Sequence, residues 1–468
     1  MRIVESEAGS LIRVSARVPG LSPWRFLRWA GGESRGFWAR GDRWLAHSGS
    51  VLTLEPPFRS RERGDDRFES VRRTSLSLRD DSPTLGGFED SELPSPRFFG
   101  GFSFGDGHDP SGVWSGFPAA RFVLPALEVR GKPEGVRIIL QELYRSQSSA
   151  SPAERRKALE TRLAGIVHEL GEEEGREGGV QRSPLAAFPF GPPEAVNGNG
   201  WGPWRAAVDA VLRAVSEGQV SKVVLARTLD VPLESGASPL QVLERLYLEN
   251  HASHVFLFEP VPGAAFLGAA PETVATLEGS SFEATAVAGS APAGTSEEDA
   301  REQGQRLLAS EKDRREHAVT TREMLRCLSP LMEELKADAE PHVLRLPGIQ
   351  HLETRVHGTV RSGEHVLSLL AAVHPTPAVC GLPREEALRL IQEVEPFERG
   401  WYAGPVGWFD LEGDGIFAPA LRSAVHGDGR WRLFAGAGLV EGSRPDAEWE
   451  ETGMKFDPVL RALGVGVR

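Results

Sequence analysis

The alternation of apolar and polar positions is clearest in the second half of the chain. An apolar stripe at helical spacing begins just after Pro203, a residue that suits the first turn of a helix, and Gly218 ends it. The stripe consists of Trp204, Val208, Val211 and Val215. The next run, Val220–Ala226, is apolar at most positions and predicts a buried strand.

The same reasoning places elements along the rest of the chain. Further helices are predicted at 152–176, 296–309, 310–336, 384–393 and 445–463, and strands at 254–259, 401–410, 415–426 and 430–440. The first 145 residues are rich in strand patterns, such as 44–54 and 120–129. Residues 171–200 are rich in Gly, Glu, Pro and Asn, which predicts a surface connection. Long strands grouped with helices favour an α+β architecture over strict βαβ alternation.

Composition narrows the classes of function. The chain has 468 residues, of which 40% are hydrophobic, enough for a large core. Its 53 Lys and Arg against 66 Asp and Glu leave a net charge of −13. An acidic surface argues against nucleic acid and against anionic membranes as partners. A protein this acidic that binds an anionic substrate needs local neutralisation by a metal cation or by a few basic side chains.

The compartment follows from cysteine usage and hydropathy. Cys327 and Cys380 form no disulfide framework, which favours a reducing compartment. The N-terminal residues are acidic and lack the apolar run of a signal peptide. The most apolar stretch, 255–270, is interrupted by a glutamate and two prolines, well short of a membrane span. We therefore expect a cytoplasmic protein that no membrane anchors.

Two residues are candidates for acid–base chemistry. Lys222 lies inside an otherwise apolar strand pattern. It is either an edge-strand lysine that points to water or a desolvated amine, and burial favours the neutral form that can act as a base. Glu272 follows a Gly-Ala-Ala-Pro segment, and is either an ordinary turn residue or the acid partner of such a base.

Two predicted helices each carry a pair of carboxylates on one face. Asp313 and Glu316 begin one helix, although Asp313 also fits a capping box with Ser310. Glu448 and Glu451 share a stripe on the last helix, together with Lys455. Each stripe is either a solvated charged face or half of an oxygen-rich site for Mg²⁺, and spacing alone leaves both open.

Other polar residues stand in apolar or glycine-rich surroundings. They are His351, His374, Tyr402 and Arg422. Arg422 lies in a strand-like run, where it forms either a structural ion pair or a bidentate grip on a carboxylate. The glycines of AVAGSAPAG and FAGAGLVEGS permit close approach of the backbone to a ligand.

The order and wording of these segments resemble the chorismate-utilising enzymes. The segments are KVVLAR, FLGAAPET, AVAGSAPAGT, SEKDRREH, HLETRVHG, HPTPAVCGLP, RGWYAGPVGW and GAGLVEGSRPDAEWEETGMK. This superfamily includes isochorismate, salicylate, anthranilate and aminodeoxychorismate synthases. The resemblance implies one α+β unit over 1–468, with two packed β-sheets surrounded by helices. Within it, 1–195 is the more divergent half and 200–465 the motif-bearing catalytic half.

The resemblance also implies roles for individual residues. The family's Mg²⁺ ligands correspond to Glu316 and Glu451, assisted by Asp313 and Glu448. Tyr402 and Arg422 correspond to residues that grip the enolpyruvyl carboxylate of chorismate. Further substrate-binding positions are Gly289, Ser290, His351, Ala378, Gly436 and Lys455.

The branch within the superfamily depends on the nucleophile. Lys222 resembles the base that activates water, and the segment around Ala378 is more similar to isochorismate than to salicylate synthases. The LLES motif of anthranilate synthases is not present, and AVAGSAP stands where aminodeoxychorismate synthases have PIKGT. We therefore expect isomerisation of chorismate with Lys222 as base and Glu272 as acid, a salicylate synthase being the alternative. The resemblance favours the menaquinone branch over the siderophore branch. We expect no glutaminase partner, and a monomer or weak homodimer.

Overall fold

The computed structural model describes residues 9–55, 67–80, 93–145, 150–172, 197–198, 200–232 and 237–465. The connection expected over 171–200 and the acidic N-terminal residues lie largely outside this range.

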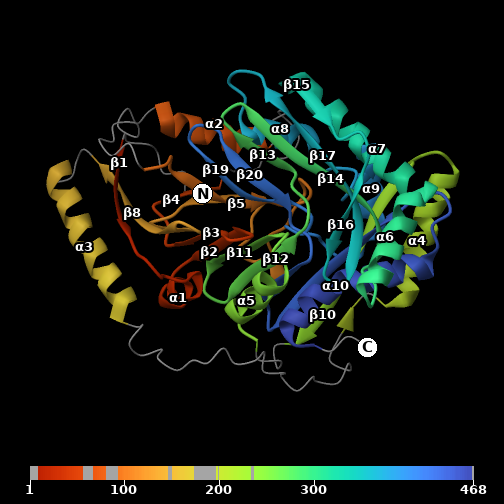
Figure 1. Cartoon of the computed structure of the whole chain (residues 1–468), viewed down its shortest axis with the longest axis horizontal. Helices are drawn as coiled ribbons and strands as arrows, with labels where there is room; N and C mark the ends of the chain where they lie inside the picture. The colour runs from red at the N-terminus through yellow and green to blue at the C-terminus, as the bar shows by residue number, and fades with distance from the viewer. Residues whose placement is uncertain are drawn as a thin grey trace.

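Strands form two large antiparallel sheets (Figure 1). The order in the first sheet is β1 (Gly9–Arg17), β8 (Gly135–Arg145), β7 (Leu127–Lys132), β3 (Arg43–Ser48), β2 (Arg35–Arg40), β11 (His254–Val261), β12 (Ala264–Ala270), β21 (Ser423–Gly427), β22 (Arg430–Leu439), β10 (Lys222–Pro232) and β18 (Gly381–Leu382), with β9 (Asn197–Gly198) on β10. The order in the second sheet is β15 (Met332–Ala337), β17 (Ile349–Val360), β14 (Ser281–Pro292), β13 (Ala275–Glu278), β20 (Gly415–Pro419), β19 (Pro405–Asp410), β5 (Arg97–Phe102), β6 (Ala120–Leu124) and β4 (Leu52–Leu54), with β16 (His342–Leu346) on β17. Both sheets take strands from both sides of residue 200, so the two halves of the chain share one framework.

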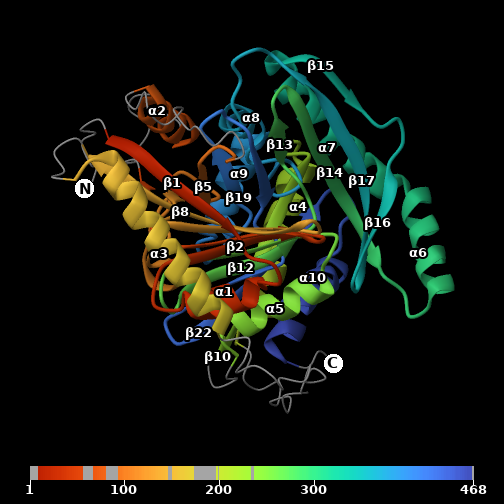
Figure 2. The same cartoon turned by 60° about the vertical axis from the view of Figure 1, so that its left-hand side comes forward.

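Helices cover the outer surfaces of the sheets (Figures 1 and 2). They are α1 (Pro23–Trp29), α2 (Arg67–Asp80), α3 (Pro152–Glu172), α4 (Trp201–Ser216), α5 (Pro239–Glu249), α6 (Glu297–Ala309), α7 (Glu311–Leu328), α8 (Val366–Val373), α9 (Arg384–Val394) and α10 (Pro445–Leu463). Helices α1, α3, α5 and α10 enclose one apolar core against the first sheet, whereas α2, α7 and α8 enclose another against the second. A third core, rich in aromatic rings, joins the sheets. The α+β prediction with two packed sheets is therefore confirmed.

The helix predicted over 310–336 is too long. Helix α7 ends at Leu328, and Met332–Ala337 is instead strand β15, which pairs with β17. Pro330 explains the break, because proline lacks the amide hydrogen that a continuing helix needs and its ring clashes with the carbonyl of the preceding turn. Helices α1 and α2 were not predicted, because the sequence of the first 145 residues indicated mainly strands.

Three predicted strands are each two strands that lie in different sheets. The segments are 44–54, 120–129 and 415–426. In the last of them, β20 belongs to the second sheet and β21 to the first. Arg422 lies in the crossover between them with a φ of 48°, so the prediction that it lies inside a strand is wrong. Such a crossover aims a side chain into the space between the sheets.

No helix in the described part of the chain is both long and apolar enough to cross a membrane.

Candidate active site

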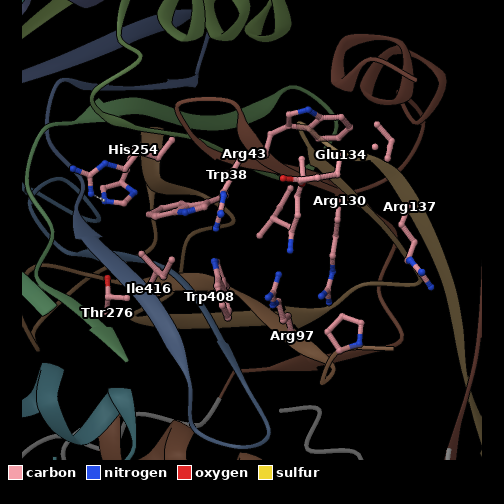
Figure 3. A pocket seen from close by; sticks show the side chains of 18 of the residues that line it. Trp38, Arg43, Arg97, Arg130, Glu134, Arg137, His254, Thr276, Trp408 and Ile416 are labelled. Atoms are coloured by element: carbon pink, nitrogen blue, oxygen red, sulfur yellow. Dashed lines mark hydrogen bonds between the residues drawn. The ribbon is translucent and has the colours of Figure 1, made fainter. Parts of the chain in front are cut away.

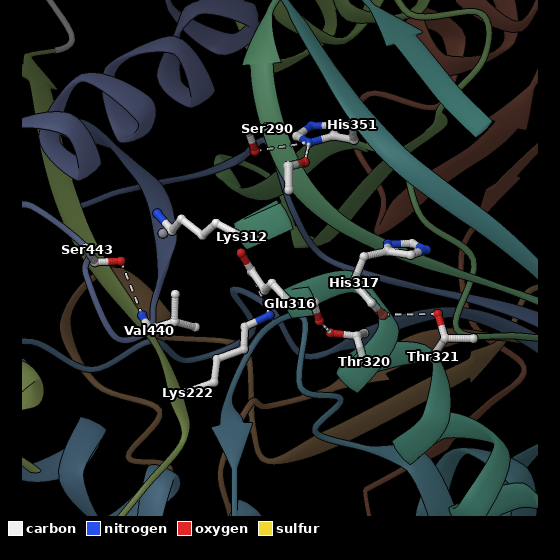
Figure 4. A network of polar contacts seen from close by, with 12 residues as sticks. Lys222, Ser290, Lys312, Glu316, His317, Thr320, Thr321, His351, Val440 and Ser443 are labelled. Carbon is white, nitrogen blue, oxygen red and sulfur yellow. Dashed lines mark hydrogen bonds and ion pairs between the residues drawn. The ribbon is translucent and has the colours of Figure 1, made fainter. Parts of the chain in front are cut away.

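Lys222 is a buried amine at the start of β10. Only 2% of the residue is exposed, and β10 is paired on one side by β22 and on the other by the short β18. The alternative of an edge lysine pointing to water is therefore excluded. Its Nζ lies 2.8 Å from Oε1 of Glu316 on α7, so the strand and the helix meet through this ion pair (Figure 4).

Glu272 is a buried carboxyl beyond the end of β12. It is 1% exposed, and its Oε1 has no hydrogen-bond partner among the described residues. Burial raises the pKa of Glu272 to about 8, an effect that the charge of Lys222 partly offsets and that Glu353 reinforces. The carboxyl is therefore protonated at neutral pH, as a general acid requires. The prediction that this pKa is raised is confirmed.

The two predicted carboxylate pairs come together between α7 and α10. Asp313 and Glu316 from the first helix line the same cavity as Glu448 and Glu451 from the second. Asp313 also takes part in the N-terminal cap of α7. The hydroxyl of Ser310 accepts a hydrogen bond from the backbone amide of Asp313 and donates one to the carboxylate of Asp313. Asp313 therefore takes part in the capping contact and also lines the cavity.

Lysines pair with three of these carboxylates, of which Glu316 pairs with Lys222 as described above. Nζ of Lys455 lies 2.6 Å from Oε1 of Glu451 and donates to the carbonyl of Gly436 at 2.8 Å. Nζ of Lys312 lies 3.4 Å from Oε1 of Glu448. Burial raises the pKa of Glu448, and the charge of Glu451 adds to the effect. In Glu451 the cost of burial is outweighed by Lys455, so its pKa is lowered.

The four carboxylates line one cavity but do not form a tight metal-binding cluster. Within the described ranges, no three His, Cys, Asp or Glu side chains converge tightly enough to count as one. Burial, with the charges of Glu316 and Glu451, raises the pKa of Asp313. Four carboxylates whose charges repel one another are hard oxygen donors of the kind that Mg²⁺ prefers. The donor set therefore fits the predicted ion in its chemistry.

Arg422 and His351 form a buried pair opposite these acids. Nη2 of Arg422 lies 2.9 Å from Nε2 of His351, and Nδ1 of His351 lies 3.0 Å from the carbonyl of Gly289. Since a carbonyl only accepts, Nδ1 carries the hydrogen and Nε2 accepts from Arg422. Burial and then the charge of Arg422 lower the pKa of His351 to about 3, so this histidine is neutral. Within the described residues Arg422 forms no ion pair, which leaves its guanidinium available to an anion.

Arg422→Lys should weaken transition-state binding by about 2–3 kcal/mol, roughly 30- to 150-fold in kcat/KM. A planar guanidinium can hold His351 and a carboxylate together, and a lysine ammonium lacks this fork. Steady-state kinetics measures the loss, and circular dichroism checks that the fold is kept. A kcat/KM within twofold of wild type would mean that Arg422 is structural.

Tyr402 lines a second cavity that adjoins the one containing Lys222 and the carboxylates. The two cavities share Arg422, Gly436 and Lys455 among their lining residues. The ring of Tyr402 stacks on Phe434 with centroids 5.0 Å apart, and burial raises the pKa of its hydroxyl to about 12. Tyr402 is therefore a neutral hydrogen-bonding group that lines the same cavity as Arg422.

Glycines let the backbone approach the charged groups closely. Gly289 has a φ of 74° at a bulge in β14, which directs its carbonyl to His351. At Gly436 an added Cβ would lie 3.1 Å from the hydroxyl of Tyr402. Gly438, another of the FAGAGLVEGS glycines, is tighter, because a Cβ there would lie 2.6 Å from Oε1 of Glu316.

Gly438→Ala should therefore lower kcat roughly a hundredfold, the scale of a small misplacement of catalytic groups. The new methyl group would displace Glu316 and press on Lys222, whose Cε would lie 3.2 Å from it. Gly453→Ala is the control, since a Cβ at this α10 position meets nothing within 4 Å. Equal kcat values for the two variants would contradict the prediction.

Every predicted site residue except Tyr402 lines one cavity. Its volume is ≈ 70 Å³ and that of the adjoining cavity ≈ 40 Å³. Both are small beside the ~300 Å³ of ordinary ligand pockets, because the lysine–carboxylate pairs cross the space. A bound anion or cation would exchange partners with these pairs.

Sequence reasoning also missed supporting residues. Lys312 lines the cavity, and so do the apolar Val224, Pro271 and Leu421. Lys312 could have been found from its place one residue before Asp313, whereas the apolar residues carry no distinguishing signal. His374 lies away from both cavities, where its Nε2 is 3.1 Å from the carbonyl of Phe104.

A buried ion pair is hydrogen-bonded to the backbone of β10, the strand that carries Lys222. Arg399 pairs with Glu395, and its Nη2 donates to the carbonyl of Val224 at 2.7 Å. Oε1 of Glu395 accepts from the amide of Ala226 at 2.7 Å. This pair fixes β10 two to four residues beyond Lys222.

The cavity between the two sheets gathers a buried lysine, a buried protonated carboxyl and several further charged side chains, as the active site of an enzyme does. The chain belongs to the chorismate binding enzyme family, whose model matches residues 2–464.

Individual relatives agree with this assignment. The chain is 36% identical to the salicylate biosynthesis isochorismate synthase of Pseudomonas aeruginosa, over 86% of this chain and 80% of that protein. It is 30% identical to isochorismate synthase MenF of Bacillus subtilis, over 97% and 93%. Among solved structures, the menaquinone-specific isochorismate synthase MenF from Escherichia coli superposes with a TM-score of 0.75 at 23% identity, covering 98% of this chain and 96% of that one. The predicted family is confirmed.

Proposed function

We propose that this protein is an isochorismate synthase, which converts chorismate to isochorismate by adding water at C2 and removing the C4 hydroxyl. One observation carries the proposal: Lys222 and Glu272, a buried amine and a buried protonated carboxyl, line one cavity. The full-length similarity to proteins named isochorismate synthase supports it.

Lys222 takes a proton from water as the oxygen attacks C2, and Glu272 gives its proton to the departing C4 hydroxyl. One hydroxyl replaces another, so the atoms balance. Lys222 has gained the proton that Glu272 lost, and proton exchange with solvent restores both groups.

The substrate is a dianion, and the cationic side chains of the site match it. Arg422 and Tyr402 hold the enolpyruvyl carboxylate, while Lys455 lies beside the carbonyl of Gly436 on the same wall. Neutral His351 orients Arg422 through the bond at Nε2. Ser290 and Ala378 complete the lining.

Glu316 and Glu451 would hold a magnesium ion, assisted by Asp313 and Glu448. When bound, such an ion supplies positive charge that fixes the ring carboxylate and offsets the repulsion among the acids. Glu316 also pairs with the ammonium of Lys222, so this carboxylate would serve both the ion and the base.

The rate should fall above about pH 8. Glu272 must be protonated to act as an acid, and its pKa is raised to about 8, so the active fraction falls about tenfold per pH unit above that value. A pH profile of kcat measures this decrease, which reports the coupled site rather than one group alone.

The free energy of unfolding should also depend on the protonation of Glu272. Between the usual pKa of 4.5 and 8 the folded state holds a proton that the unfolded state has lost, so stability decreases as the pH rises. Glu272→Gln should lack this loss, and its melting temperature should exceed that of wild type increasingly from pH 5 to pH 8. A constant difference between the two would contradict the raised pKa.

The direct test is to incubate the pure protein with chorismate and Mg²⁺ and identify the product by chromatography and NMR. Isochorismate alone is expected. Salicylate and pyruvate would identify a salicylate synthase, and unchanged chorismate would overturn the proposal. No glutaminase should be needed, because water and not ammonia is the nucleophile.

We also propose that the product serves menaquinone synthesis. Support comes from the match to Bacillus subtilis MenF over 97% of the chain, whereas isochorismate synthase EntC of Escherichia coli matches over 53%. The gene should restore menaquinone to a bacterial strain that lacks its own isochorismate synthases. Recovery of siderophore without menaquinone would assign it to the other branch.

A further inference from the structure

Helix α10 is held unevenly along its length (Figure 1). Its buried apolar side chains all lie within 456–463, whereas the first half buries only Glu448 and Thr452. Pro458 lacks an amide hydrogen, so one backbone hydrogen bond between the two halves is missing. The turns that carry Glu448 and Glu451 therefore need contacts of their own to fix their orientation.

Arg227 supplies these contacts from the middle of β10, the strand that begins with the proposed base. The residue is 6% exposed. Its Nε donates to Oγ1 of Thr452 at 2.7 Å, and its Nη2 donates to the carbonyl of Trp449 at 3.3 Å. The hydroxyl of Thr452 donates to the same carbonyl at 2.8 Å. One arginine thus contacts the two residues that directly follow Glu448 and Glu451 in the chain.

The guanidinium of Arg227 also lies against two aromatic rings of α10. Its Cζ is 3.7 Å from the ring centroid of Trp449 and 4.8 Å from that of Phe456. Trp449 in turn contacts Trp201 and Trp204 on α4, with ring centroids 5.7 and 6.1 Å apart. A guanidinium stacked on a ring and hydrogen-bonded at its edge accepts few geometries, so these contacts resist rotation of the helix.

Among the described residues, no carboxylate pairs with Arg227. Burial alone lowers the pKa of its guanidinium to about 10. A buried charge without an ion pair costs free energy, and an apolar side chain would fill this place at a lower cost. Such a side chain would lack the hydrogen bonds that set the rotation of α10.

The influence of Arg227 on the site is indirect. Arg227 lines neither the catalytic cavity nor the one that adjoins it, and it is also absent from the larger cavity lined by Trp38, Arg97 and Trp408 (Figure 3). Side chains reach about 5–6 Å from a helix axis, so a rotation of about 20° would move the carboxylate of Glu451 by about 2 Å. Metal–ligand distances tolerate only about 0.2 Å.

We propose that Arg227 is a positioning residue, which fixes the rotation of the first half of α10 so that Glu448 and Glu451 together face the cavity and hold a divalent cation. The inference rests on the metal site of the proposed function. It adds a residue outside the cavity that determines how tightly the ion is bound.

The test measures Mg²⁺ binding by isothermal titration calorimetry without chorismate, so it does not depend on turnover. Arg227→Met keeps a long side chain against the rings but removes both hydrogen bonds, and its dissociation constant for Mg²⁺ should be at least tenfold above that of the wild type. Arg227→Lys keeps the charge without the planar fork and should lie between the two. Thr452→Val keeps the size of threonine and removes the acceptor of Nε. It should raise the constant at least threefold, and this mild substitution keeps the test valid if Arg227→Met does not fold.

Val459→Ala is the matched control for helix stability. Val459 is 1% exposed in the second half of α10, so its truncation leaves a cavity in the core and should lower the melting temperature. Its dissociation constant for Mg²⁺ should stay within twofold of the wild type. An equal rise in Val459→Ala and Arg227→Met would overturn the proposal, because Arg227 would then only stabilise the helix. Wild-type affinity in Arg227→Lys would overturn the role of the directional contacts.

Failure of the metal site and failure of this inference give different results. A wild type that binds no Mg²⁺ would overturn the metal site, and the inference with it. A wild type that binds Mg²⁺ beside a well-folded Arg227→Met protein that binds it equally well would overturn the inference alone. Turnover supplies a second measurement. The Mg²⁺ concentration for half-maximal rate should rise at least tenfold in Arg227→Met and stay within twofold in Val459→Ala, and an unchanged value in Arg227→Met would contradict the proposal.

Discussion

Lys222→Ala should lower kcat for isochorismate formation by about three to four orders of magnitude, the upper range for loss of a general base. The amine is buried 2.8 Å from Glu316, and no other lysine lies so deep in the cavity. Chorismate should still bind, because Arg422 and Lys455 remain. Titration calorimetry with Mg²⁺ present measures binding, and product analysis measures turnover.

The substitution also removes the ion-pair partner of Glu316, so a control is needed. Lys312→Ala removes another lysine–glutamate pair of the same cavity, 3.4 Å apart and half exposed. It should cost less than about tenfold, as exposed ion pairs contribute little. Comparable losses in the two variants would indicate a general electrostatic effect. Substantial isochorismate from the Lys222→Ala protein would show that another group activates the water.

Turnover should disappear when divalent cations are removed by a chelator, and excess Mg²⁺ should restore it. The physical reason is the group of carboxylates on α7 and α10, whose mutual repulsion no single lysine relieves. Glu451→Gln, which keeps the size and removes one charge, should abolish turnover even at high Mg²⁺, with the melting curve retained.

Glu450→Gln is the matched control, because this neighbour on α10 is exposed and outside the cavity. It should behave as the wild type does. Full activity in excess chelator would contradict the metal proposal outright. Activity of Glu451→Gln that saturates at wild-type kcat would place the ion elsewhere.

Local pattern was a sound guide for several helices that each bury a continuous apolar face. Helices α4, α9 and α10 match their predicted ranges within a residue or two, because their apolar stripes are long and uninterrupted. The pattern failed at 415–426, where one apolar run serves two sheets. An apolar run reports burial, and both of these strands are buried.

The site residues were recognised as a set through resemblance and not through spacing. Spacing placed Asp313 with Glu316 and Glu448 with Glu451 on shared helix faces, but left open whether the two helices meet. It also left open whether Lys222 faces water. Only packing decides such questions, since they depend on contacts between segments far apart in the chain.

The sequence by itself determined the α+β class, helices α4, α6, α9 and α10, several strands, the family and the residues that line the candidate site. The tertiary structure alone decided that Arg422 lies at a crossover between sheets, that Gly438 leaves room for Glu316, and that Glu272 is buried deeply enough to hold its proton. The physical reason is that element formation depends on neighbours a few residues apart, whereas burial, proton affinity and charge clustering depend on distances through space.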